Sequence, residues 1–167
     1  MKNIGNNRHS IRIKNYDYSQ EGWYYVTICT KDRKQILSKI HDCNCRGRAL
    51  PLPQNTEIGN IIENSIKYFN NKYYNLKIEK YVIMPNHLHM IIQIKGKDGA
   101  LPLQDVIRTL KSFTSVQCYK RRYLKSAKLW QRNYYEHIIR NEKEYWKIYE
   151  YIENNHQNWI TDKYYEQ

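Results

Sequence analysis

Two histidines separated by one residue, His87 and His89, are the side chains in this sequence best suited to chemistry. They follow Pro85-Asn86, a turn signal, at the start of an apolar run that predicts a strand. Alternate side chains of a strand point to the same face, so both imidazoles would project together and Leu88 would face the core. Two nitrogen donors on one exposed face predict a divalent metal site. The pair alone leaves open that both are ordinary surface histidines.

A second pair of candidates, Tyr151 and Asn155, lies near the C-terminus, where apolar spacing predicts a helix from Asn141 to about Asn155. Tyr151 lies roughly 120° around the helix axis from Tyr145, but only about 40° from Asn155. This helix therefore presents a phenol and a carboxamide together at the margin of its buried face. Its core face is predicted to hold Tyr145, Ile148, Tyr149 and Ile152.

The remaining elements must position these two pairs. Aromatic and β-branched residues predict a strand at 23–30, and alternation predicts strands at 76–84 and 88–94 and a short one at 134–139. Helical periodicity predicts helices at 56–69 and 103–119, and Pro and Gly mark a variable loop at 38–56. This order predicts an α+β fold of the ferredoxin-like split βαβ type, a mainly antiparallel sheet with helices packed on one face.

The composition narrows the class of protein. The 167 residues fit one domain, and 28 Lys and Arg against 16 Asp and Glu give a net charge of +12, which favours a polyanionic partner such as nucleic acid. With 41% hydrophobic and 14% aromatic residues the chain is no disordered basic tail, and a mean hydropathy of −0.90 excludes an integral membrane protein. Four scattered cysteines and the lack of a signal-peptide pattern predict reduced thiols and a cytoplasmic location.

Several blocks, in this order, resemble the single-tyrosine HUH transposases, in particular the REP-associated tyrosine transposases and their IS200-like relatives. The blocks are YVIMPNHLHM at 81–90, KSFTS at 111–115, LWQRNYYEHIIRNEKEY at 129–145 and YIENNHQNW at 151–159. The resemblance runs from about Ile11 to Trp159. It implies a single transposase domain over 1–167, with a basic N-terminal arm at 1–20 and the loop at 38–56 as its variable part.

The resemblance also implies roles for the candidate residues. His87 and His89 would be metal ligands, Asn155 would complete the metal site, and Tyr151 would be the catalytic nucleophile. The implied cofactor is Mn²⁺ or Mg²⁺, and the implied reaction is attack on a phosphodiester of single-stranded or hairpin DNA, with a 5′-phosphotyrosine intermediate and strand transfer. The family often has Pro after this Asn, where the chain has His156, which leaves a further candidate ligand. Both a monomer and a homodimer stay open.

A basic surface with interleaved tyrosines is expected to bind the DNA by charge and stacking. A domesticated, catalytically silent regulator that binds hairpin DNA is the alternative function. An RNA-binding module is disfavoured, because it would not explain the histidines together with Tyr151. The candidate DNA-binding residues are Arg8, Arg12, Lys14, Lys111, Arg121, Arg122, Arg132, Tyr134 and Tyr135.

Overall fold

The computed structural model describes residues 17–18, 20–40, 52–96 and 101–165. The larger elements lie within three residues of their predicted bounds, whereas the two-residue strands and the 3₁₀ helices, labelled η, were not expected. In chain order the elements are β1 (Gly22–Cys29), η1 (Lys31–Arg33), β2 (Ser38–Lys39), β3 (Gln54–Asn55), α1 (Glu57–Lys72), β4 (Leu76–Ile83), β5 (His87–Ile94), α2 (Leu103–Lys120), β6 (Tyr135–Ile139), α3 (Glu142–Asn154) and η2 (Asn155–Thr161).

The main sheet has four strands in the order β4-β5-β1-β6, and every neighbouring pair is antiparallel. The register places His89 beside Thr27 of β1 and Val82 of β4. Helices α1 and α2 form the two crossover connections, from β1 to β4 and from β5 to β6. This arrangement confirms the predicted α+β class and its split βαβ layout.

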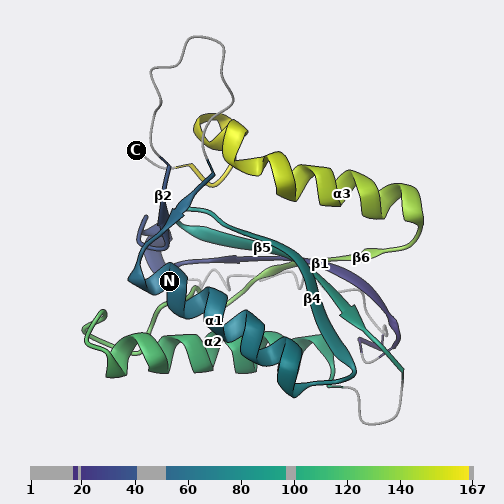
Figure 1. Cartoon of the computed structure of the whole chain (residues 1–167), viewed down its shortest axis with the longest axis horizontal. Coiled ribbons are helices and arrows are strands. Elements are labelled where there is room, and N and C mark those ends of the chain that lie inside the picture. Colours follow the sequence, from purple (N-terminus) through teal and green to yellow (C-terminus); the bar gives the residue numbers. More distant parts are fainter. Residues whose placement is uncertain (1–16, 19, 41–51, 97–100, 166–167) are drawn as a thin grey trace, which may run out of the picture.

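The larger apolar core lies between the sheet and the helices α1 and α2, which run along one face (Figure 1). Alternate residues of β5, Leu88, Met90 and Ile92, are fully buried there. They pack with apolar side chains of α1 and α2, including Ile62 and Ile107. Complete burial of such side chains is the main favourable contribution to folding in a domain of this size.

Helix α3 lies across the opposite face of the sheet (Figure 1). The expectation that helices pack on one face therefore holds for the two crossover helices but not for α3. Strand alternation explains the difference. Tyr25 of β1 and Ile91 of β5 point to the other face of the sheet, where they form a second apolar surface that is stabilised by burial against another element. Ile152 of α3 supplies this burial, packing with Ile91 and Ile139.

The start of α3 is held by a polar cluster at the end of β6. Asn141 is the N-cap of α3, and its side-chain oxygen accepts from the backbone N–H of Glu144 at 2.9 Å. The Glu144 carboxylate accepts from the backbone N–H of Arg140 at 2.8 Å and contacts Nε2 of His137 at 2.7 Å. These bonds orient α3 relative to β6, so that its second half lies over the histidine-bearing face of β5.

Short strands lie at both ends of the predicted variable loop at 38–56. Its two ends pair as the antiparallel strands β2 and β3, and residues 41–51 lie outside the described part of the chain. Most of the predicted N-terminal arm also lies outside it. Among the described residues, no helix combines the length and the apolar character needed to cross a membrane.

Candidate active site

His87 and His89 begin β5 and point to the α3 side of the sheet, as their spacing predicts. Their ring centroids lie 4.5 Å apart. The expectation that both are exposed is wrong, because each has 0% exposed surface. Aromatic rings from other elements pack around them, with Tyr151 5.4 Å from His89, and Trp159 and Tyr164 respectively 5.9 and 4.7 Å from His87.

A third potential ligand, Asp162, joins the two histidines. One ligand atom from each of His87, His89 and Asp162 lies within 4.8 Å of the others. Sequence reasoning missed Asp162, because it follows η2 in a segment without helical or strand periodicity. In the sequence, Asp162 is marked only as an acidic residue seven positions after Asn155. Two imidazoles and a carboxylate form a group that could bind a divalent metal ion.

The hydrogen bonds of His87 leave one ring nitrogen available for such an ion. Asn86 donates its amide N–H to the backbone oxygen of Tyr164 at 2.7 Å, so its side-chain oxygen faces the ring. That oxygen lies 2.8 Å from Nδ1 of His87, which must then be the N–H donor. The proton assignment leaves a lone pair on Nε2. Metal-binding histidines are commonly oriented by such a bond from the other nitrogen.

His89 is also held through Nδ1, but by hydroxyl groups, which can donate or accept a hydrogen bond. Its Nδ1 lies 2.8 Å from both the Tyr25 hydroxyl and the Thr27 hydroxyl of β1. The Nε2 atoms of His87 and His89 are buried and have no hydrogen-bond partner among the described residues. A buried polar atom without a partner costs about 1–3 kcal/mol. Two such atoms beside a carboxylate fit a bound cation, which would give both a partner.

Both imidazoles are neutral at neutral pH. Burial lowers the pKa of His87 to about 4, against the opposing effect of the Asp162 carboxylate. Burial lowers the pKa of His89 well below its ordinary value, and the neighbouring His87 lowers it further. A neutral imidazole is the form that binds a metal, so no proton has to be displaced from either ring near pH 7.

Tyr151 lies at the edge of this group with 40% of its surface exposed. Its ring contacts those of His89 and Tyr25, the latter with centroids 6.3 Å apart. Burial raises the pKa of the Tyr151 hydroxyl, as does the negative charge of Asp162, whereas hydrogen bonding to Asn155 lowers it. Tyr151 is thus the half-exposed phenol beside the histidines, while Tyr149 lies next to Lys80, whose Nζ is 4.2 Å from its ring centroid.

Asn155 and His156 follow Tyr151 at the end of the helix, and both are buried. Asn155 donates to the Asp162 carboxylate at 3.3 Å, and its side-chain oxygen has no hydrogen-bond partner among the described residues. Asn155 therefore lies beside the candidate metal group through its contact with Asp162. His156 is not part of the His87, His89 and Asp162 cluster.

The predicted DNA-binding residues fall into separate groups. Tyr135 is 42% exposed and lies beside the site, 6.0 Å from the Tyr25 ring. Tyr134 instead packs against the core on the α1 and α2 side.

The predicted basic residues that the structure describes do not gather at the site. The Lys111 ammonium donates to the backbone oxygens of residues 131 and 132, so it fixes a loop. Exposed Arg121, Arg122 and Arg132 lie at or after the end of α2, and Arg8, Arg12 and Lys14 lie outside the described residues.

Two cations near the site were not predicted. Lys163 places its ammonium 4.9 Å from the Tyr164 ring centroid and 5.3 Å from that of Tyr135. The Arg33 guanidinium lies 5.5 Å from the Tyr164 ring centroid. Positive charge thus lies close to the candidate ligands, where both cations lower the pKa of His87.

Comparison with known proteins finds relatives over most of the chain. Residues 18–155 match the family model described as Transposase IS200 like. An uncharacterised protein of Haemophilus influenzae is 36% identical, over 95% of this chain and 93% of its own length. Asp162 and the segment that carries it lie beyond the residues that match the family model.

Two solved structures share the fold. One is a REP-associated tyrosine transposase bound to a REP hairpin, with a TM-score of 0.62 and 20% identity, covering 93% of this chain and 76% of that one. The other is a candidate transposase from Deinococcus radiodurans, with a TM-score of 0.52 and 19% identity, covering 87% of this chain and 97% of that one. With the family match over most of its length, the chain belongs to the IS200-like transposase family.

Proposed function

We propose that this chain is a DNA transposase that cleaves and rejoins single-stranded or hairpin DNA through a covalent bond to Tyr151. The proposal rests above all on the placement of a half-exposed phenol against His89, next to two buried imidazole nitrogens without partners among the described residues. The related transposase bound to a REP hairpin supports DNA as the substrate. Tyr151 and both histidines come from the same chain, so the proposed site is complete in a monomer.

His87, His89 and Asp162 would hold the divalent ion, with the side-chain oxygen of Asn155 as a further ligand. Nitrogen and oxygen ligands together suit Mn²⁺, and Mg²⁺ is the abundant alternative. When bound, the ion supplies Lewis-acid polarisation of the phosphate oxygens and favours the ionised phenol. The chain's own part is to keep both imidazoles neutral and oriented through Asn86, Tyr25 and Thr27.

The proposed step exchanges one phosphodiester for another. The Tyr151 oxygen forms a bond to phosphorus while the bond from phosphorus to the 3′ oxygen breaks. The phenol loses its proton and the 3′ oxygen gains one, so the products are a 5′-phosphotyrosine and a free 3′-hydroxyl. Because the covalent product retains a phosphodiester, a 3′-hydroxyl can reverse the reaction and complete strand transfer without ATP.

Trapping the covalent intermediate tests the proposal. The full chain is incubated with Mn²⁺ and single-stranded DNA from the flanks of its own gene, and adducts are resolved on a denaturing gel. Tyr151→Phe should keep the melting temperature and hairpin binding but form no adduct, because only the attacking hydroxyl is removed.

Tyr149→Phe, two residues earlier on α3, is the matched control and should still form the adduct. It removes the same hydroxyl from a neighbouring tyrosine whose ring lies against Lys80 rather than His89. An adduct that persists in Tyr151→Phe would contradict the proposal. Hairpin binding without any adduct in the unaltered chain would instead favour the silent DNA-binding regulator.

A further inference from the structure

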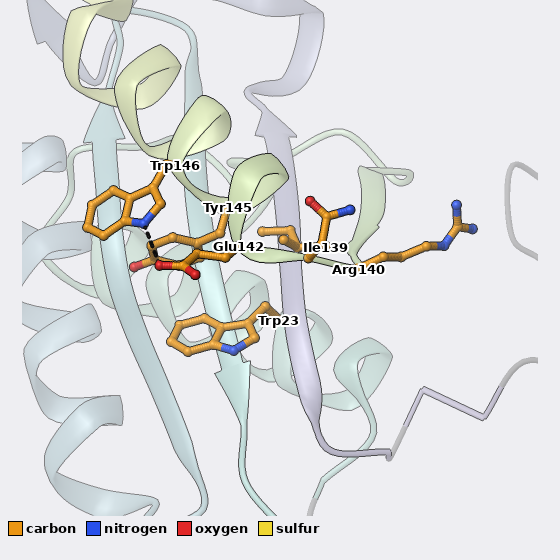
Figure 2. A pocket seen from close by; sticks show the side chains of 7 residues that line it. Trp23, Ile139, Arg140, Glu142, Tyr145 and Trp146 are labelled. Atoms are coloured by element: carbon orange, nitrogen blue, oxygen red, sulfur yellow. Dashed lines mark hydrogen bonds between the residues drawn. The ribbon is translucent and has the colours of Figure 1, made fainter.

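An aromatic pocket of about 490 Å³ lies at the start of α3, at the other end of that helix from Tyr151. Figure 2 shows the indoles of Trp146 and Trp23 on either side of Tyr145 and Glu142, with the Arg140 side chain extending away from the rings. The ring of Tyr145 meets Trp23 edge-on at 4.9 Å and Trp146 edge-on at 5.3 Å. Trp146 is nevertheless 51% exposed, so a large part of its indole faces the solvent.

The lining combines three kinds of contact that suit a nucleotide. Indole and phenol rings offer stacking surface, which is worth about 1–3 kcal/mol per base in single-strand binding. Glu142 accepts from the Trp146 indole N–H at 3.3 Å and has further acceptor capacity for the N–H groups of a base. Arg140 is exposed at the rim, where a phosphate would lie outside the ring cluster.

We propose that this pocket holds one unpaired base of the DNA strand that Tyr151 cleaves. The inference rests on the proposed function, because it takes Tyr151 as the point of attack. A purely apolar ligand would leave Arg140 and Glu142 without a role at the opening. A single-stranded, negatively charged partner also matches the net charge of +12.

The distance between the pocket and Tyr151 suits a neighbouring nucleotide. Tyr145 and Tyr151 are six residues apart on α3, about 9 Å at 1.5 Å per residue. Trp23 and Tyr25 lie on the same face of β1, about 7 Å apart, and the Tyr25 ring contacts Tyr151. Stacked nucleotides advance about 3.4 Å along a strand, so the base would lie within about three nucleotides of the cleaved bond.

Abasic substitutions can locate this base. Oligonucleotides with one abasic site, moved in turn through every unpaired position, are bound to the full-length Tyr151→Phe chain without metal. One position should weaken binding about 10-fold. Trp146→Ala in the same background should weaken binding of the intact oligonucleotide by a similar factor and abolish the effect of that abasic site. Tyr68→Ala is the control, since Tyr68 is 45% exposed and packs against two aromatic rings on α1 and α2.

The outcomes separate the pocket from the proposed chemistry. If no abasic position couples to Trp146 although the unaltered chain forms the Tyr151 adduct, the pocket assignment is overturned and the proposed function stands. If coupling is found but no adduct forms in the unaltered chain, the pocket is supported and the proposed function fails. If Trp146→Ala lowers the melting temperature, Glu142→Gln is used in its place. Binding is then measured with each of the four bases at the position found by the abasic scan. The proposal would be overturned if Glu142→Gln left the differences in affinity among the four bases unchanged.

Discussion

The two faces of the sheet are built from alternate residues of the same strands, yet they differ in chemistry. On the α1 and α2 side, Leu88 and Met90 are buried among apolar side chains. On the α3 side, His87 and His89 are just as buried but keep ring nitrogens without hydrogen-bond partners among the described residues. The face under α1 and α2 therefore stabilises the fold by apolar burial. The face under α3 carries buried nitrogens whose missing hydrogen bonds cost free energy, and a bound ligand would reduce that cost.

The largest expected effect comes from the polar face. His89→Ala should abolish formation of the DNA adduct and weaken Mn²⁺ binding more than about 100-fold, since losing even a supporting residue of a metal site costs about 10- to 100-fold. Titration calorimetry with Mn²⁺ and the denaturing gel measure the two effects. A thermal melt confirms that the variant is folded. Unchanged Mn²⁺ binding in the folded variant would remove His89 from the metal site.

The neighbouring residue on the apolar face should behave in the opposite way. Leu88→Ala should lower the free energy of unfolding by about 2–5 kcal/mol, because it leaves a cavity in the fully buried core. Its folded fraction should still bind Mn²⁺, since Leu88 points away from the histidines. Denaturant unfolding measures the first effect and calorimetry the second. Loss of metal binding in folded Leu88→Ala would show that the two faces are not independent.

The sequence predicted those parts of the fold and of the candidate site that follow from periodicity, because periodicity determines which face of a strand or helix a side chain occupies. Alternation correctly placed His87 and His89 on one face with Leu88 in the core, and helical phase correctly paired Tyr151 with Asn155. Alternation does not say what covers a face, so the burial of both histidines was missed. Asp162 was missed because it reaches the site through irregular turns, where no repeat links sequence position to direction.

A smaller effect is expected at Asp162. Asp162→Asn should weaken Mn²⁺ binding about 10-fold while both histidines remain, because a neutral amide is a poorer ligand than a carboxylate. Asp105→Asn is the control, since Asp105 pairs with Arg108 on α2 at 3.0 Å, away from the site. Equal Mn²⁺ affinities for the two variants would exclude Asp162 from the metal group.

The smallest effect is expected where α3 meets β4 through an ion pair. Glu153→Gln should change the free energy of unfolding by less than about 1 kcal/mol, although Lys80 and Glu153 lie 2.9 Å apart, because Glu153 is exposed. Ile152→Ala, one residue away and fully buried, should cost several times more. Chemical denaturation of both variants decides whether apolar contacts hold α3 on the sheet.

The most direct test of the proposed active site is to find the tyrosine that carries DNA. The full chain is trapped with Mn²⁺ and single-stranded DNA, digested, and analysed by mass spectrometry for a nucleotide-linked peptide. With 17 tyrosines in the chain, the outcome is discriminating. We predict the nucleotide on Tyr151, beside His89. A nucleotide on any other tyrosine would contradict the assignment of the active site to the α3 face.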